Sequence, residues 1–156
     1  MTINTPLATD DQTVAAQALQ GSLADLLDLS LNAKQAHWTV VGPLFRSLHE
    51  ELDELASLSR DFADRLAERS AAIGRAPDGR PGTITATSGL SALPAGWIKD
   101  SDVRGLMTTS MAVLISRMRQ RVEDTSTADP VTQDLLINLT GELEKQHWML
   151  QAQSSY

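Results

Sequence analysis

The sequence predicts an all-α protein in which four long helices form a bundle and one long crossover joins the second helix to the third. Two observations support this prediction: apolar residues recur at helical spacing in four segments, and the connections between those segments are short, long and short. With 156 residues, of which 42% are hydrophobic, the chain suits one domain with a sizeable core, and we expect no second domain.

The first helix is expected from about residue 10 to about residue 40. Thr9 and Gln12 match a capping box at its start, and Gly42-Pro43 ends it. Residues 1–9 then form a short N-terminal extension, and residues 10–156 form the bundle domain. The apolar repeat that predicts this helix consists of Val14, Ala18, Leu19, Leu23, Leu26, Leu27 and Leu31.

The second helix is expected from about residue 44 to about residue 73, with Gly74 as its C-terminal cap. Its apolar residues fall on one stripe, which predicts the face that packs against the core of the bundle. The stripe consists of Leu48, Leu52, Leu55, Phe62 and Leu66.

The segment from Gly74 to Asp100 holds three prolines and, with Gly74 itself, five glycines, and we interpret it as the long crossover. Long loops without structure of their own are uncommon in compact domains, so this one is expected to cross the bundle or to line an interface. A short helix is expected near Ser88 to Leu93.

The third helix is expected from about residue 102 to about residue 125, after an N-cap at Ser101. The fourth is expected from about residue 130 to about residue 152, with Asp129 as N-cap and Pro130 at the first helical position. Four helices with one long crossover between the second and the third form a bundle of the ferritin-like type.

Composition restricts the possible functions. The chain has no cysteine, so a disulfide framework, a thiolate zinc site and a cysteine nucleophile are excluded, and any metal ligands must be histidine or carboxylate. A net charge of −7 argues against a broad nucleic-acid surface and favours cations as small partners. The N-terminus resembles no signal peptide and no stretch is long enough to span a membrane, so we expect a soluble, cytoplasmic protein.

Two pairs of potential metal ligands lie on the second predicted helix. His49 and Asp53 are four residues apart, as are Asp64 and Glu68, so each pair stands on one helix face and can bind one ion. His49 and Asp64 are fifteen residues apart, which is about 22 Å along a helix. One copy of the helix therefore cannot close the site, whereas an antiparallel copy related by a two-fold axis brings the two pairs together. The metal chemistry is expected to need a dimer.

These ligands face away from the predicted core. Each residue advances by about 100° around the helix axis. With His49 set at zero, the three carboxylates fall between about 40° and about 100°, whereas the apolar stripe centres at about −100°. His37 lies about as far before the Gly42-Pro43 turn as His49 lies after it, so the two imidazoles are expected to come close. One acidic residue on such a face is usually only solvated. Here two of the three histidines lie beside carboxylates at complementary helical spacing. This arrangement favours a metal site instead.

Three sequence elements, KxxHW, LHxxxD and DxxxE, occur in this order along the chain. With them the chain resembles the Dps family, the bacterial mini-ferritins, over residues 10–152. The stretches that carry the resemblance run from Lys34 to Pro43, from Leu48 to Glu54, from Asp64 to Arg69, from Asp134 to Leu136 and from Gly141 to Trp148.

The resemblance implies a ferroxidase and iron-storage protein. It implies a hollow homo-dodecamer that takes up Fe²⁺, oxidises it with hydrogen peroxide in preference to oxygen, stores ferric mineral inside, and so protects the cell and its DNA. The residues that match the family's metal-binding and catalytic ligands are His37, His49 and Asp53 of one subunit with Asp64 and Glu68 of its two-fold mate. This assignment agrees with the distance argument made from the helix alone.

Four further acidic residues resemble the family's three-fold entry pore for iron. Asp129 is already expected to cap a helix, and the remaining three are equally consistent with solvated surface. The four residues are Glu123, Asp124, Asp129 and Asp134.

Several neighbours of the site have a functional and an ordinary interpretation. Glu50, Glu51 and Glu54 are candidates for mineral nucleation on the inner wall, or they are solvated. Trp38 either shields the site or packs in an interface. His147 lacks a carboxylate pair at matching spacing apart from Glu144, so we expect a satisfied structural histidine and assign it no metal.

Two alternative functions stay open beside iron oxidation and storage. A DNA-compacting nucleoid protein is disfavoured, because the segment before the first helix has no Lys or Arg and the last six residues are uncharged, so we expect no tail-mediated binding to DNA. A metal-dependent hydrolase using the same intersubunit site would need a pocket for an organic substrate.

Overall fold

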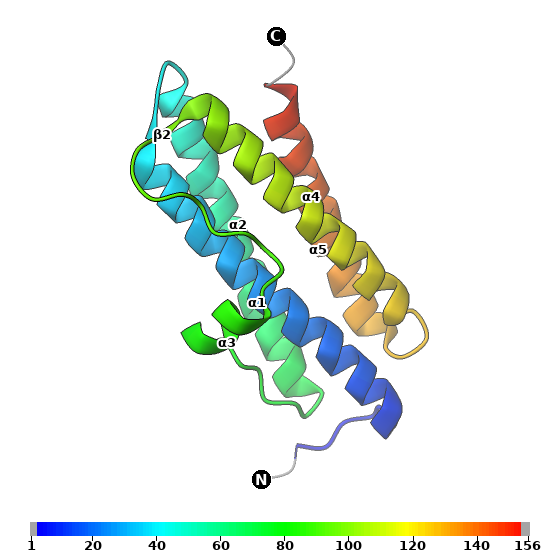
Figure 1. The fold of residues 1–156 in the computed structure, drawn as a ribbon. Coiled ribbons are helices and arrows are strands. Elements are labelled where there is room, and N and C mark those ends of the chain that lie inside the picture. Colours follow the sequence, from blue (N-terminus) through cyan, green and yellow to red (C-terminus); the bar gives the residue numbers. More distant parts are fainter. Residues whose placement is uncertain (1–2, 154–156) are drawn as a thin grey trace.

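The computed structural model describes residues 3–153 and shows a bundle of four long helices, which confirms the predicted fold (Figure 1). A fifth, short helix lies on the crossover. Within the described residues, no helix combines the length and the apolar character that crossing a membrane requires. The helices are α1 (Thr9–Thr39), α2 (Phe45–Ala72), α3 (Pro81–Thr87), α4 (Asp100–Asp124) and α5 (Pro130–Ala152).

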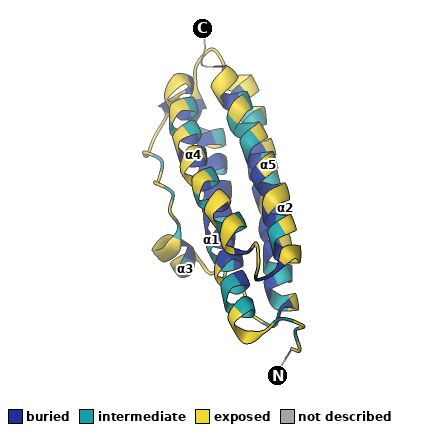
Figure 2. Cartoon of the chain, turned by 90° about the vertical axis from the view of Figure 1, so that its right-hand side faces the viewer, coloured by how far each residue is buried: buried dark blue, intermediate teal, exposed yellow. Residues whose placement is uncertain are grey.

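The core lies between the four long helices, and each helix turns one face toward it (Figure 2). On α2, the whole predicted apolar stripe is buried, with Leu48, Leu52 and Leu66 fully inaccessible. The opposite face of α2 is exposed along its length. The stripe prediction is therefore confirmed, and the face that carries Asp53, Asp64 and Glu68 is exposed.

Two of the predicted helix boundaries are confirmed with their caps. The Asp129 side chain accepts the Val131 N–H at the start of α5, and Pro130 is its first residue. After α2, Gly74 adopts φ +82°, which favours glycine. The N–H groups of Gly74 and Arg75 donate to Ala71 O and Ser70 O, both at 2.9 Å, so the helix ends in a Schellman motif.

Two predicted N-caps are wrong. Thr9 lies inside α1 rather than before it, and Gln12 donates from Nε2 to Ile73 O at 2.6 Å instead of capping its own helix. Ser101 lies inside α4, because Asp100 begins that helix: one Asp100 oxygen accepts the Ser101 N–H at 2.8 Å and the other accepts the Leu44 N–H at 2.7 Å. In both cases the polar side chain binds the backbone at one end of α2 instead of forming the predicted local cap.

The approach of Asp100 to the α1–α2 turn requires a glycine. Gly42 has φ +138°, and a Cβ atom placed there would lie 2.5 Å from the Asp100 carboxyl carbon. Asp100 therefore fixes the start of α4 against the turn that separates α1 from α2.

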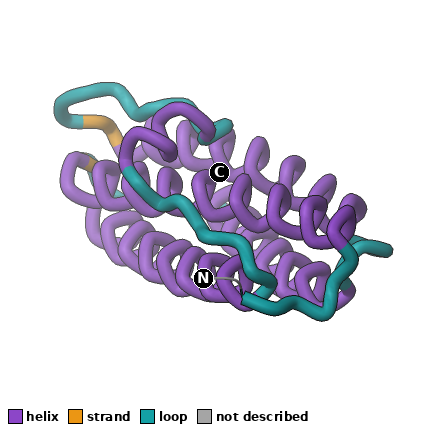
Figure 3. The backbone as a smooth tube through the Cα atoms, turned by 90° about the horizontal axis from the view of Figure 1, so that it is seen from below, coloured by secondary structure: helices purple, strands orange, loops and turns teal. Residues whose placement is uncertain are grey.

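The short helix of the crossover is α3 (Pro81–Thr87), so the prediction of a helix near Ser88 to Leu93 is wrong. Asp78 accounts for its position, because the carboxylate accepts the Arg80 N–H at 3.1 Å and the Thr83 hydroxyl at 2.8 Å. The next segment is extended because its polar groups bind α1 instead: Ser88 donates to Asp28 and the Gly89 N–H donates to Asp25. The crossover thus runs across the bundle, as predicted (Figure 3).

A short parallel β pair closes the crossover and was not predicted. β1 (Val40–Val41) follows α1 directly, and β2 (Ile98–Lys99) precedes α4, with Val40 paired to Ile98 and Val41 to Lys99. Two-residue strands carry too little sequence signal to be recognised without the tertiary contact.

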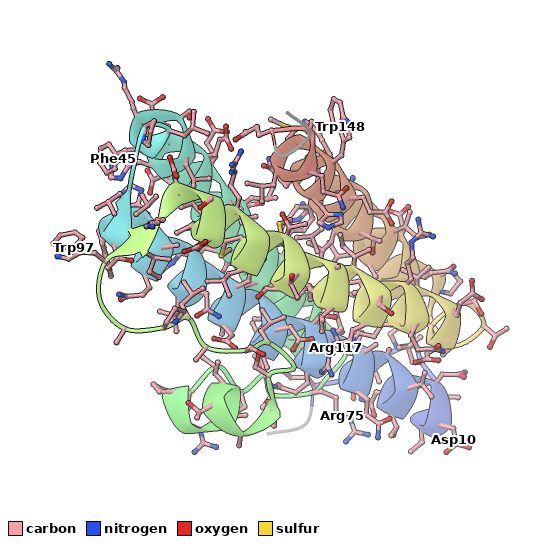
Figure 4. All side chains as sticks on the ribbon, turned by 45° about the horizontal axis from the view of Figure 1, so that its top comes forward. Asp10, Phe45, Arg75, Trp97, Arg117 and Trp148 are labelled. Atoms are coloured by element: carbon pink, nitrogen blue, oxygen red, sulfur yellow. The ribbon has the colours of Figure 1, made fainter. Side chains whose placement is uncertain are left out.

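A buried carboxylate joins α1, α4 and the crossover. Asp25 is inaccessible, and its Oδ2 accepts from Arg117 Nε at 2.9 Å and from Arg121 Nη2 at 2.8 Å. Its Oδ1 accepts the Gly89 N–H at 2.9 Å. Arg117, labelled in Figure 4, lies on α4, and its guanidinium bridges to Asp25 of α1. Burial lowers the pKa of the Arg121 guanidinium, and the charge of Asp25 opposes that effect.

Asp129 forms a second buried network, between α2 and α5. It is 2% exposed, accepts from Arg69 Nη2 at 2.6 Å and also accepts the Thr132 hydroxyl. Burial raises the pKa of the Asp129 carboxyl, but the contacts with Thr132 and Arg69 outweigh it, so the pKa lies below its usual value. Of the four carboxylates that resemble a pore, the other three are exposed.

Replacing Asp129 by Asn keeps a capping side chain but removes the charge that faces Arg69. We expect the free energy of unfolding to fall by about 2 kcal/mol at neutral pH. Because the folded-state pKa is depressed, this contribution is present above the unfolded pKa of about 3.9 and is lost as the pH falls through the folded pKa. Denaturant unfolding of wild type and D129N from neutral to acidic pH should give converging stabilities below about pH 4. D134N is the control, and a wild-type advantage that persists in acid contradicts the prediction.

Candidate metal centre

His37 and His49 face each other across the α1–α2 turn. His37 lies in the last turn of α1 and His49 in the first turns of α2, and each Nδ1 is hydrogen-bonded to the backbone carbonyl of the other residue, at 2.7 Å and 2.8 Å. The two rings stack with centroids 3.5 Å apart, and the Phe45 ring lies 5.0 Å from that of His49. The structure thus confirms the prediction that the two imidazoles come close.

The reciprocal hydrogen bonds determine which ring nitrogen is available. A carbonyl oxygen only accepts, so each Nδ1 carries the proton and donates, and Nε2 is the unprotonated nitrogen of each neutral ring. Metal-bound histidines commonly donate their other ring N–H to a carbonyl in this way, which fixes the tautomer and the orientation of the ring. Neither Nε2 atom takes part in the hydrogen bonds that hold the two rings together.

Asp53, the third predicted ligand of this group, is exposed one turn after His49 and forms an ion pair with Lys34 of α1. The hydrogen bond from Lys34 is the main cause that lowers the pKa of the Asp53 carboxyl, and the histidines add to it. The Asp53 carboxylate is therefore ionised at neutral pH, and the Lys34 ammonium is its positively charged partner.

Asp64 and Glu68 are exposed one turn apart on the distal half of α2. Neither carboxylate has a hydrogen bond or ion pair within residues 3–153. In the described part of one chain, no three His, Asp or Glu side chains converge closely enough to hold a metal. A single subunit thus brings His37, His49 and Asp53 to one end of α2 and leaves Asp64 and Glu68 at the other.

Lys34 is a further member of this group that was not predicted from the sequence. Lys34 precedes His37 by three residues, which places both side chains on the same face of α1, so the spacing alone contained the signal.

The prediction of a satisfied His147 is wrong, because its buried Nε2 has no hydrogen-bond partner. Trp38 is 62% exposed, so a shielding role for it stays a prediction. The Glu51 carboxylate accepts from Gln153 Nε2 at 2.6 Å.

Comparison with known proteins gives a consistent relationship. Residues 16–155 match the family model of the ferritin-like domain. The chain is 39% identical over 144 residues to DNA protection during starvation protein 2 of Deinococcus radiodurans, a match that covers 92% of this chain but only 60% of that longer protein. It is 38% identical over 144 residues to the DNA protection during starvation protein of Mycolicibacterium smegmatis, covering 88% of this chain and 75% of the relative.

Solved structures extend the similarity to the fold. The structure of Dps from Microbacterium arborescens in the high iron form superposes with a TM-score of 0.92 at 28% identity, covering 98% of this chain and all of that chain. The helical bundle, the motifs around His37 and His49, and these relatives agree, and the chain belongs to the Dps family of ferritin-like proteins.

Proposed function

We propose that this protein is a ferroxidase that oxidises Fe²⁺ at sites shared between two subunits and stores the ferric product inside a hollow dodecamer. The observation that carries the proposal is the reciprocal hydrogen bonding of His37 and His49, which leaves two Nε2 atoms as ligands. Asp53 completes this half of the site, and Asp64 and Glu68 of a two-fold mate supply the other half. We further propose that the protein works in the cytoplasm.

The donor set suits Fe²⁺ as the substrate. Imidazole and carboxylate ligands bind Fe²⁺ well, and a site with few protein ligands keeps coordination positions open for the oxidant. The carboxylates of Asp64 and Glu68 have no competing partner within residues 3–153 and are free to bind. Lys34 balances the charge of Asp53 until a metal ion replaces it.

The preferred oxidant is hydrogen peroxide. One peroxide accepts two electrons, one from each of two Fe²⁺ ions, and its O–O bond breaks to give two oxygens at the oxidation level of water. Water hydrolyses the resulting Fe³⁺ to ferric oxyhydroxide and releases protons. This two-electron route produces no hydroxyl radical, so the reaction removes both reagents that damage DNA.

Replacing both His37 and His49 by Gly should leave the shell assembled, since neither residue belongs to the buried stripe of α2. Oxidation of Fe²⁺ by peroxide should slow to near the uncatalysed rate, because both nitrogen ligands are gone. Stopped-flow absorbance with peroxide and with oxygen measures the effect. His147→Gln is the control and should keep wild-type kinetics, whereas wild-type kinetics in an intact H37G/H49G shell would place the site elsewhere.

Replacing Lys34 by Met should tighten the binding of Fe²⁺, since the ammonium no longer competes for Asp53. We expect the dissociation constant to fall by about three- to tenfold, as a partly screened charge a few ångströms from the metal implies. Anaerobic titration calorimetry with Fe²⁺ measures this. Lys145→Met removes an exposed lysine from α5 and should leave the affinity unchanged. Weaker binding by K34M would show that Lys34 assists the site, and equal binding would show that it does not compete for Asp53; either result contradicts the prediction.

The assembled shell should not retard duplex DNA at near-physiological salt. With a net charge of −7 per chain, few cations are available to replace the counterions of the phosphates. A gel-shift titration over a series of salt concentrations tests this directly. Strong retardation that weakens steeply with salt would reveal a basic patch on the shell, drawn from residues such as Arg75 and Arg80 of the crossover, and would favour direct DNA compaction.

A further inference from the structure

One exposed stripe on α2 has palindromic spacing. It contains the four proposed ligands of this helix and two further residues between them. Consecutive members are four, four, three, four and four residues apart, so the stripe reads the same from either end. All members are exposed except His49, which is half-buried. They are His49, Asp53, Ser57, Arg60, Asp64 and Glu68.

Palindromic spacing is what an antiparallel two-fold contact of α2 with its own copy requires, because each residue must meet its counterpart at the same height. This inference rests on the proposed intersubunit site. The register that sets Asp53 opposite the partner's Asp64 also sets His49 opposite the partner's Glu68. The same register sets Ser57 opposite the partner's Arg60, on either side of the two-fold axis.

Both central residues lie on the ligand face. At about 100° per residue from His49, Arg60 falls near 20° and Ser57 near 80°, inside the arc of roughly 0° to 100° that the ligands occupy. Neither residue belongs to the buried core. The centre of the contact therefore consists of these two side chains, each present twice.

The two side chains are complementary. Ser57 Oγ donates its proton to Asp53 O at 2.9 Å, so its lone pairs remain available to accept a hydrogen bond. Arg60 offers five N–H donors and has no hydrogen bond or ion pair within residues 3–153. Any other register would move Arg60 away from the hydroxyl and separate the ligand pairs as well.

We propose that Arg60 of each subunit donates a hydrogen bond to Ser57 of its two-fold mate, and that this pair fixes the register in which the two halves of the metal site meet. Arg60 is a positioning residue. Arg60 lies one turn from Asp64 of its own helix. The serine that it faces on the mate lies one turn from the partner's Asp53. Arg60 therefore borders the metal site that Asp64 and the partner's Asp53 share. The positive charge also offsets the repulsion between these carboxylates before a metal binds.

The register makes exchange of the two residues the decisive test. In Ser57→Arg, an arginine meets the partner's Arg60 twice per dimer, whereas in Arg60→Ser two hydroxyls meet and the guanidinium is lost. The double variant S57R/R60S restores an arginine opposite a serine, because the two positions face each other across the axis. The exchange keeps composition and net charge, so only position changes. Circular dichroism confirms that each variant remains helical, as expected for exposed helical positions.

Mass photometry over a dilution series measures assembly, and anaerobic titration with Co²⁺ measures the metal site. We expect S57R to raise the concentration for half-assembly by about tenfold or more, since like charges meet twice, and R60S to raise it by a few-fold. In each variant that assembles more weakly, the affinity for Co²⁺ should fall as well. S57R/R60S should return both values to within about twofold of wild type.

Two results would overturn the proposal: S57R assembling as wild type does, or the double variant assembling as poorly as S57R. Failure of the proposed function looks different. In that case wild-type protein binds no Co²⁺ at a subunit interface, or the H37G/H49G variant binds Co²⁺ as wild type does, whatever the Ser57 and Arg60 variants show.

Discussion

The length of the continuous helix α2 keeps its two pairs of proposed ligands apart. The helix is continuous from Phe45 to Ala72, so His49 and Asp64 stay about 22 Å apart in any arrangement of one chain. The apolar stripe of α2 is buried inside the bundle, and its ligand face is left outside. A metal site built from both pairs therefore has to be completed by a second subunit.

Contacts within and beyond the proposed metal site hold that helix in place. The hydrogen bonds between His37 and His49 join the end of α1 to the start of α2, so the same nitrogen atoms that orient the ligands also join the helices. Asp100 secures the turn between these helices to α4, and Asp25 holds the crossover and α4 on α1. A rigid helix pair keeps the two imidazoles at a fixed geometry, which would lower the entropic cost of binding the proposed metal.

The features that sequence analysis predicted correctly depend on local chemistry. The four helices follow from their apolar periodicity, and the caps at Gly74 and Asp129 follow from residues that act within a few positions of themselves. The proximity of His37 and His49 followed from the short turn between two antiparallel helices.

The features that it missed depend on contacts between distant segments. Gln12 and Asp100 bind other helix ends in place of the expected local caps. The short helix of the crossover begins where Asp78 binds Arg80 and Thr83, and Ser88 is held in an extended segment by α1. The partnership of Lys34 and Asp53 needed the packing of α1 on α2, although helical spacing already placed Lys34 beside His37.

The central claim is that iron is held between two subunits rather than within one. Anomalous scattering from iron-soaked crystals measures the position of the metal relative to the two-fold axis. We expect a peak within coordination distance of the imidazoles of His37 and His49 and the Asp53 carboxylate of one subunit, and of Asp64 and Glu68 from the other. A peak whose protein ligands all come from one chain, or a peak remote from the imidazoles, would contradict it.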